Sequence, residues 1–303
     1  ARLGIARATV VVSPSVWGSH NAYIQKCLSR FAIDVVIAPG GEPYLEAGLN
    51  LSRQLQRFSP DVVIAIGGGS AMDLAKLAWV LYEKPELDLQ SDRVVLTVSG
   101  LRSRITGFVA VPTTYGSGAE NSSSAVFQSE KLGKKRFLVG PELVPDIAVL
   151  DPALALALPI CVATSGVMDT LAHAIEGYVS KGSNAATKQL SISSIIPLKS
   201  ALSGTTIDTL VSDEKAVEAF MVSAAFAGVV QNIANPGLAH SLSHYCAKYG
   251  VVHGQGCGYY LPLSLRYNAQ DDAVTADYDS LATSIGHLSM ETQPDTDRQC
   301  RSN

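Results

Sequence analysis

The sequence predicts an α/β domain built on a parallel sheet, followed by an all-helical domain. From Ala8 to Leu150, short β-branched runs alternate with segments of helical periodicity, which is the pattern of successive βαβ units. After Asp151 the chain becomes rich in alanine and leucine and has few strand signals. A chain of 303 residues is near the limit for one hydrophobic core. We therefore expect an α/β domain over residues 1–155 and a helical domain over residues 156–303.

The expected strands are short and several are apolar on both faces, as a parallel sheet covered by helices requires. They cover residues 8–13, 34–39, 61–67, 93–99, 108–112 and 146–151. Apolar residues recur at helical spacing between them, over residues 44–58 and 70–83. These alternating segments predict a sheet of the nucleotide-binding kind.

The second half carries helical patterns with only short interruptions. Helices are expected over residues 164–180, 184–202 and 212–234, and a further helical segment holds most of the remaining histidines. Ser212, followed by Asp213 and Glu214, is typical of a helix start. The tail from Asp271 is polar and has little apolar periodicity. A cleft between the two halves is the expected place for a functional site.

The composition excludes several classes of partner. The chain is 47% hydrophobic and 17% charged, with a net charge of −4 and no long basic block, so we expect neither a nucleic-acid nor an anionic-membrane partner. No apolar run reaches the ~18 residues of a membrane span. The five cysteines are odd in number and lack CxxC spacing, which favours a reducing cytoplasm over a disulfide framework or a structural zinc knot. Small-molecule ligands are expected.

Histidines and one carboxylate indicate a metal site. Asp169 and His173 are four residues apart, so both lie on one face of the helix predicted over residues 164–180. His240 and His244 repeat this spacing downstream, and His253 follows. One carboxylate with two or three imidazoles suits Fe(II) or Zn(II) better than calcium or magnesium. Taken singly, each histidine is better explained as a hydrogen-bonded core residue, and the i, i+4 spacing seen twice shifts the balance toward a metal site.

A glycine-rich turn follows the strand expected at residues 61–67. Gly67, Gly68, Gly69 and Ser70 lead into a helix that contains Asp73. Small residues let the backbone approach an anion, and helix N–H groups point toward it, so the turn is suited to a diphosphate. It is neither the GxGxxG fingerprint nor a P-loop. The alternative is a tight strand-to-helix turn that needs positive φ.

A second polar turn follows the strand at residues 108–112. Thr113, Thr114 and Ser117 supply hydroxyl groups next to glycines, at what should be the carboxyl edge of the sheet. Such a turn can hold a ribose or phosphate, and two such turns in one sheet favour a dinucleotide. An ordinary Ser/Thr-rich loop is the alternative.

Five motifs occur in the order found in the iron-containing (group III) alcohol dehydrogenases, which this chain resembles from about Ala8 to about Asn268. They read GGGSAMDLAK, VPTTYGSGAE, DPALALALP, SGVMDTLAHAIEGYVS and GLAHSLSHYCAKYGVVHGQ. The resemblance implies a Rossmann-like α/β domain and a helical metal-binding domain, the architecture shared with dehydroquinate synthase. It also implies a homodimeric oxidoreductase that moves a hydride between NAD(P)(H) and a small alcohol or aldehyde.

The resemblance assigns roles to particular residues. It implies metal ligands at Asp169, His173, His240 and His253, and a catalytic role for His244 beside the nicotinamide. The cofactor would be bound by residues of the two turns and one lysine, namely Gly68, Gly69, Ser70, Asp73, Thr113, Thr114, Ser117 and Lys135. Fe(II) and Zn(II) both remain open as the metal.

The chain departs from the family pattern in two places. Pro14 stands where NAD-preferring members often carry an aspartate that repels a 2′-phosphate, so NAD and NADP both remain open. Between Gly286 and the final DTDRQCRSN little corresponds to the family's last helices, which indicates lost helices or an omitted stretch. The alternatives are a glycerol-dehydrogenase-like or dehydroquinate-synthase-like enzyme, or a decayed, non-catalytic nucleotide-binding homologue. The substrate itself is not predicted.

Overall fold

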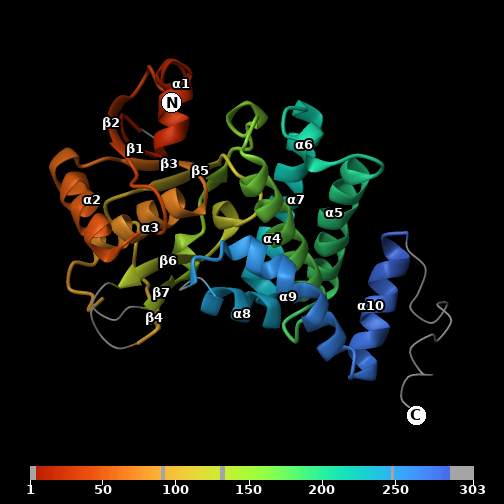
Figure 1. The fold of residues 1–303 in the computed structure, drawn as a ribbon. Helices are drawn as coiled ribbons and strands as arrows, with labels where there is room; N and C mark the ends of the chain where they lie inside the picture. Colours follow the sequence, from red (N-terminus) through yellow and green to blue (C-terminus); the bar gives the residue numbers. More distant parts are fainter. Residues whose placement is uncertain (1–4, 90–92, 130–133, 247–248, 287–303) are drawn as a thin grey trace, which may run out of the picture.

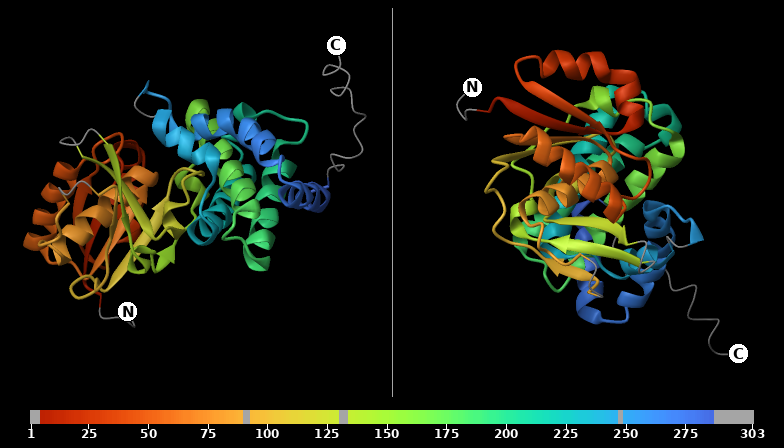
Figure 2. Two further views of the ribbon diagram at one scale, coloured as in Figure 1. Left: turned by 90° about the horizontal axis from the view of Figure 1, so that it is seen from below. Right: turned by 90° about the vertical axis from the view of Figure 1, so that its left-hand side faces the viewer.

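The chain forms an α/β part and a helical part that lie side by side, as Figure 1 and the left view of Figure 2 show. This computed structural model describes residues 5–89, 93–129, 134–246 and 249–286. The predicted order, a parallel-sheet domain followed by helices, is confirmed. The predictions for Cys300 and the last segment, 295–303, lie outside the described residues.

A five-stranded parallel sheet forms the centre of the α/β part, with the order β2-β1-β3-β5-β8. Its strands are β1 (Arg7–Val12), β2 (Ala32–Ile37), β3 (Val62–Gly67), β5 (Gly107–Pro112) and β8 (Ile147–Ala148). Gly67 pairs with Pro112 at the ends of the neighbouring strands β3 and β5. The glycine turn and the Thr113 turn therefore leave the sheet side by side.

Helices cover both faces of this sheet. α1 (Pro14–Cys27) packs Val16 and Ile24 on one face, while α2 (Leu45–Phe58) and α3 (Gly69–Glu83) pack on the other. The side chain of Trp79 on α3 is stacked on Phe108 of β5, with ring centroids 5.6 Å apart. All but a few residues of α3 are buried, because a second sheet covers its other side.

The second sheet has three strands, β4 (Val95–Thr97), β7 (Lys134–Val139) and β6 (Ser124–Ser129). β6 and β7 form an antiparallel hairpin that the sequence patterns did not predict. The strand expected over residues 93–99 lies in this sheet, paired in parallel with β7, and is not part of the central sheet. Residues 119–124, which link the two sheets, run over α3.

The helical part is a bundle around α4. Its helices are α4 (Ile160–Val179), α5 (Ala185–Leu202), α6 (Ile207–Leu210), α7 (Glu214–Ala234), α8 (Leu238–Cys246), α9 (His253–Asn268) and α10 (Asp272–Ser284). Asp213 caps α7 by accepting hydrogen bonds from Lys215 N and Ala216 N. α10 begins after the Asp271 cap, although the sequence there had no clear helical periodicity. Among the described helices, α7 alone is long and apolar enough to cross a membrane, and half of that window is buried, as in a core helix.

The two parts meet at a close backbone contact. Gly118, with φ of +61°, lies so near Gly228 of α7 that a Cβ on it would stand 2.4 Å from the Gly228 Cα. Gln231 Nε2 donates to Ser117 O over 2.7 Å, and Asn121 Nδ2 donates to Ala225 O over 3.0 Å. Two hydrogen bonds, and the absence of a side chain on the two glycines, therefore hold the Thr113 turn against α7.

Candidate metal and cofactor cleft

A cleft of about 740 Å³ runs between the carboxyl edge of the central sheet and helices α4, α8 and α9. Most of the residues that the sequence predicted for a site line it, and they come from both parts of the chain. They are Gly69, Ser70, Asp73, Thr114, Ser117, Lys135, Asp169, His173, His240, His244 and His253. Of the predicted cofactor residues, Gly68 and Thr113 stand just behind these lining residues, in the same two turns.

The glycine turn is tight because its residues touch the neighbouring loop. A Cβ on Gly69 would stand 2.9 Å from Cβ and Oγ of Ser117, and a Cβ on Gly68 would stand 3.3 Å from Thr114 Oγ1. The positive-φ explanation is wrong, because Gly67, Gly68 and Gly69 are not among the described residues with positive φ. The glycines instead let two loops meet at the start of α3, whose free N–H groups face the cleft.

Lys76 of α3 holds the chain that follows the Thr113 turn in place. Its Nζ donates to Ala119 O, Ser122 O and Ser124 O at 2.8, 2.7 and 3.1 Å. Burial lowers the pKa of Lys76 to about 8, against the opposing pull of Asp73 and Glu120. Burial also raises the pKa of Asp73 to about 7, although Lys76 opposes it. Lys76 was not among the predicted site residues, because nothing local in the sequence shows that three distant carbonyl groups converge on it.

Lys135 of β7 also lines the cleft. Its Nζ forms an ion pair with Glu42, whose other carboxylate oxygen accepts a hydrogen bond from Gln128 Nε2 over 2.8 Å. Glu42 also lines the cleft. The lysine is therefore held at the wall by a carboxylate that the sequence analysis had not singled out.

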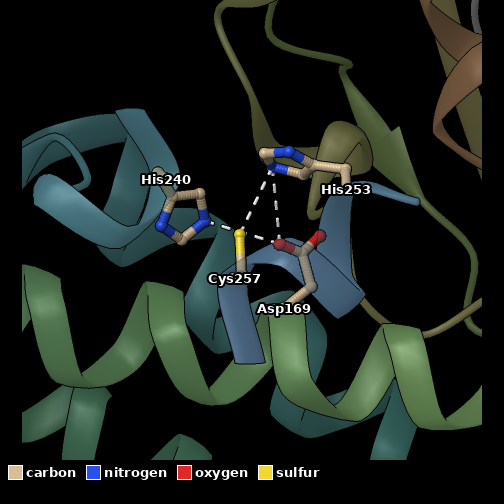
Figure 3. Close-up of side chains that lie close together, drawn as sticks. All are labelled: Asp169, His240, His253 and Cys257. Carbon is tan, nitrogen blue, oxygen red and sulfur yellow. Dashed lines mark hydrogen bonds and ion pairs between the residues drawn. The ribbon is translucent and has the colours of Figure 1, made fainter. Parts of the chain in front are cut away.

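Three helices bring four potential metal donors together (Figure 3). Ligand atoms of Asp169 on α4, His240 on α8, and His253 and Cys257 on α9 all lie within 4.8 Å of one another. His173 lies next to this group, with its ring centroid 4.1 Å from that of His240. The sequence analysis missed Cys257. The available signal was its position four residues after His253, which places both on one face of a helix.

The close approach of these helices depends on small residues at their contacts. A Cβ on Gly254 would stand 2.0 Å from Ser165 O of α4, and one on Gly256 would stand 2.6 Å from Ser243 Oγ of α8. Any larger side chain at Gly254 would push α9 away from α4. The GQG pattern after His253 therefore sets the distance between the carboxylate of Asp169 and the histidines.

Hydrogen bonds orient two of the imidazole rings. His240 Nδ1 lies 2.6 Å from Glu176 Oε2, and Glu176 is held by Ala239 N over 2.7 Å. Ser243 Oγ donates to His253 O, so it must accept from His253 Nδ1, which is 2.9 Å away. We therefore assign a proton to Nδ1 in both rings, which turns both Nε2 atoms toward Asp169. Carboxylate or hydroxyl partners of this kind commonly orient metal-binding histidines.

The inward-facing atoms lack good partners. Asp169 Oδ1 is 3.4 Å from His240 Nε2 and 3.6 Å from His253 Nε2, which is long for a hydrogen bond. Asp169 Oδ1, His240 Nε2 and His173 Nδ1 are buried without a hydrogen-bond partner. Unpaired buried polar atoms are costly, and a bound cation would satisfy several of them at once. The donor set therefore fits a divalent transition metal.

The titratable groups of the cluster shift one another's pKa. Burial disfavours the charged form of Asp169, but the adjacent His173 and His240 outweigh this and hold its pKa well below the ordinary value. Burial, aided by His240, lowers the pKa of His173 to about 3. For His240, burial is outweighed by the carboxylates of Asp169 and Glu176, which raise its pKa. Burial also raises the pKa of the Cys257 thiol.

His244 lines the cleft beside the cluster. Its ring is stacked on that of His253, with centroids 4.4 Å apart, and Phe137 meets it edge-on at 5.5 Å. Burial, together with His253 and Lys135, lowers the pKa of His244 to about 3, so the ring is neutral at neutral pH. Its Nδ1 has no hydrogen-bond partner. Nδ1 is therefore free to form a hydrogen bond with a group in the cleft.

Two family models match the chain, one for each part. Residues 1–152 match the model for iron-containing alcohol dehydrogenase, and residues 162–301 match that for the C-terminal part of the Fe-containing alcohol dehydrogenase family. A solved iron-containing alcohol dehydrogenase from Thermococcus thioreducens is similar in structure. It has a TM-score of 0.84 and 26% identity, covering 95% of this chain and 76% of that one.

Curated proteins are also similar in sequence. The aldehyde-alcohol dehydrogenase of Streptococcus pneumoniae serotype 4 is 33% identical over 218 residues, which is 69% of this chain and 24% of that protein. The NADPH-dependent butanol dehydrogenase of Clostridium saccharobutylicum is 31% identical over 203 residues, 67% of this chain and 51% of that protein. The chain thus spans between a quarter and about half of the length of these relatives.

Proposed function

Because the chain belongs to the iron-containing alcohol dehydrogenase family, we propose that it is a metal-dependent alcohol dehydrogenase or aldehyde reductase. It would transfer a hydride between NAD(P)(H) and a small alcohol or aldehyde. The observation that carries this proposal is the convergence of Asp169, His240 and His253 on a cleft whose other wall is the glycine turn. Asp169 Oδ1 and His240 Nε2 have no hydrogen-bond partner there. A cytoplasmic homodimer is part of the same proposal.

Asp169, His240 and His253 would hold the metal, and the sequence analysis assigns the fourth ligand position to His173. When bound, a divalent ion supplies Lewis-acid stabilisation of negative charge on the substrate oxygen. Glu176 and Ser243 keep the two imidazoles turned with Nε2 inward, because each accepts a hydrogen bond from an Nδ1–H group. This fixed orientation removes the need to reorganise the donors during the reaction.

His244 would move the proton. Its neutral ring lines the cleft and its Nδ1 is without a partner, so it can accept a proton from the alcohol hydroxyl and return it to an aldehyde oxygen. Phe137 and the His253 ring hold the imidazole on two sides, which restricts its rotation. The reacting group and the proton acceptor would thus share one face of the cleft.

The cofactor would lie along the opposite wall. Gly68, Gly69, Ser70 and Asp73 at the start of α3 would bind the diphosphate, while Thr113, Thr114 and Ser117 would contact the adjacent ribose or phosphate. Lys135 would face the cofactor from β7. Pro14 at the start of α1 supplies no carboxylate against a 2′-phosphate, and a relative is an NADPH-dependent butanol dehydrogenase, so we propose that NADPH is accepted as well as NADH.

The test is substitution of a proposed ligand. We expect His240→Ala to lose stoichiometric metal and to lose turnover of small aldehydes with NADH and NADPH, measured in Fe(II)- and Zn(II)-loaded samples. His20→Ala, on α1 and not among the residues lining the cleft, is the matched control and should keep both. Full metal content together with full turnover in His240→Ala would show the ligand assignment to be wrong.

A further inference from the structure

We propose that Cys257 is a ligand of the metal centre. Together with Asp169, His240 and His253 it would form a tetrahedral set of one sulfur, one oxygen and two nitrogen donors. Such a set favours a zinc-class ion over Fe(II). This inference rests on the proposed function only in assuming that the cluster binds a divalent metal.

Cys257 is placed to reach the cluster. It lies one turn after His253 on α9 and has 0% exposure, packed among Ala172, Ala239 and Leu261. Figure 3 shows its sulfur pointing from α9 toward the space between His240, His253 and Asp169. A sulfur so enclosed is closed to bulk solvent and lies against the proposed ligands.

The separations match the edges of a tetrahedron. With zinc bonds of about 2.3 Å to sulfur and 2.0–2.1 Å to nitrogen or oxygen, tetrahedral angles give edges of about 3.6 Å for S···N and about 3.3 Å for O···N. The Cys257 Sγ to His253 Nε2 distance is 3.7 Å. Asp169 Oδ1 is 3.4 Å from His240 Nε2 and 3.6 Å from His253 Nε2. Octahedral angles would require edges of about 3 Å, which are shorter than all three.

Two further atoms indicate that a ligand is needed at this point. Asp169 Oδ1 and His240 Nε2 face Cys257 and lack hydrogen-bond partners, although Asp169 is only 6% exposed and His240 only 2%. His173 is next to the cluster but is not one of the four residues whose ligand atoms are mutually within 4.8 Å. Cys257 would therefore take the place that the sequence analysis assigned to His173.

The donor set has a chemical consequence. Sulfur binds as the thiolate, so metal binding would release the Sγ proton to solvent and form one metal–sulfur bond. Thiolate donors favour zinc, and divalent zinc binds common donor sets more tightly than Fe(II). Zinc can also expand from four to five ligands, so four protein donors are compatible with the proposed reaction.

Cobalt(II) is the probe that separates sulfur from the other donors. We would strip the full chain with a chelator, add one equivalent of Co(II) and record its absorption spectrum. We expect a near-ultraviolet sulfur-to-cobalt charge-transfer band, lost in Cys257→Ser and Cys257→Ala while cobalt still binds. Cys246→Ser, which removes a thiol of α8 that contacts Tyr260 OH, should keep the band. In zinc-against-iron competition, Cys257→Ser should lower zinc preference about tenfold or more.

The outcomes distinguish failure of the Cys257 ligand from failure of metal binding as a whole. Stoichiometric cobalt without the band in the wild-type chain, or a band that survives in both Cys257 variants, overturns the thiolate ligand and leaves the proposed function standing. Failure of the wild-type chain to bind cobalt or zinc overturns both. Circular dichroism of each variant establishes that it is folded, and the wild-type spectrum decides the question even where a variant is not.

Discussion

The buried ammonium group of Lys76 has all its hydrogen-bond partners within the chain, whereas the buried carboxylate of Asp169 does not. Lys76, in the α/β part, donates to three carbonyl oxygens and has Asp73 and Glu120 nearby. Asp169, in the helical part, has an oxygen with no hydrogen-bond partner. The first arrangement is complete within the chain and holds a turn in shape. The second is incomplete, and its missing partner is the reason to expect a ligand.

Removing Lys76 should have the largest effect on stability. Lys76→Met leaves three buried carbonyl groups without their donor and Glu120 without a nearby cation, and breaking a buried charge cluster costs about 3–5 kcal/mol. Urea unfolding, compared with Lys26→Met at an exposed position of α1, measures the loss. A loss no larger than that of the Lys26 variant would contradict a structural role for Lys76.

Metal should stabilise the helical part. A ligand that binds only the folded chain adds about 2.7 kcal/mol at 100 times its Kd. We expect zinc to raise the Tm of the wild-type chain, a chelator to reverse the rise, and His240→Ala to abolish it. If zinc raised the Tm of the wild-type chain and of His240→Ala equally, the stabilising site would lie elsewhere.

Glu83 offers a second complete cluster, and its effect should depend on pH. Its carboxylate accepts from Ser103 N, Ile105 N and Trp79 Nε1, each within 3.0 Å. Burial opposes ionisation, but these donors outweigh it and hold the pKa of Glu83 below its ordinary 4.5. Because the folded pKa is the lower one, the stabilisation is present above about pH 4.5 and is lost as pH falls through the folded pKa.

Glu83→Gln should therefore cost about 2 kcal/mol near neutral pH and much less in acid. Urea unfolding at several pH values gives the profile. Glu86→Gln, exposed beyond the end of α3, is the control and should give a flat, small difference. A cost for Glu83→Gln that stays the same down to acid pH would show that the charge of Glu83 is not what matters.

The smallest expected effect concerns cofactor choice at the start of α1. Pro14 is the first residue of α1, and Ser13 beside it donates its N–H to Ile66 O at the glycine turn, 3.0 Å away. Pro14→Asp would place a carboxylate near the proposed 2′-phosphate position and should reduce kcat/KM for NADPH relative to NADH about tenfold, about 1.4 kcal/mol. Pro14→Asn has the same size without the charge, so an equal change in both variants would rule out repulsion as the cause.

The sequence predicted features that depend on residue spacing within one segment of the chain. Strand and helix patterns predicted the two-part order, which is confirmed, and the helix predicted to carry Asp169 and His173 is present as α4. Features that depend on distant contacts were missed. Glu176, Ser243 and Cys257 matter because α4, α8 and α9 come together, and no pattern within one helix reveals that. The β6–β7 hairpin was missed because its serines and lysines do not give a clear apolar alternation.

The contact between Gly118 and Gly228 has a consequence for how reactants come and go. With backbone packed on backbone, and with Gln231 and Asn121 bonded across it, the α/β and helical parts cannot swing open without breaking that junction. A cofactor bound as proposed would then enter and leave through the mouth of the cleft, without a swing of one part away from the other.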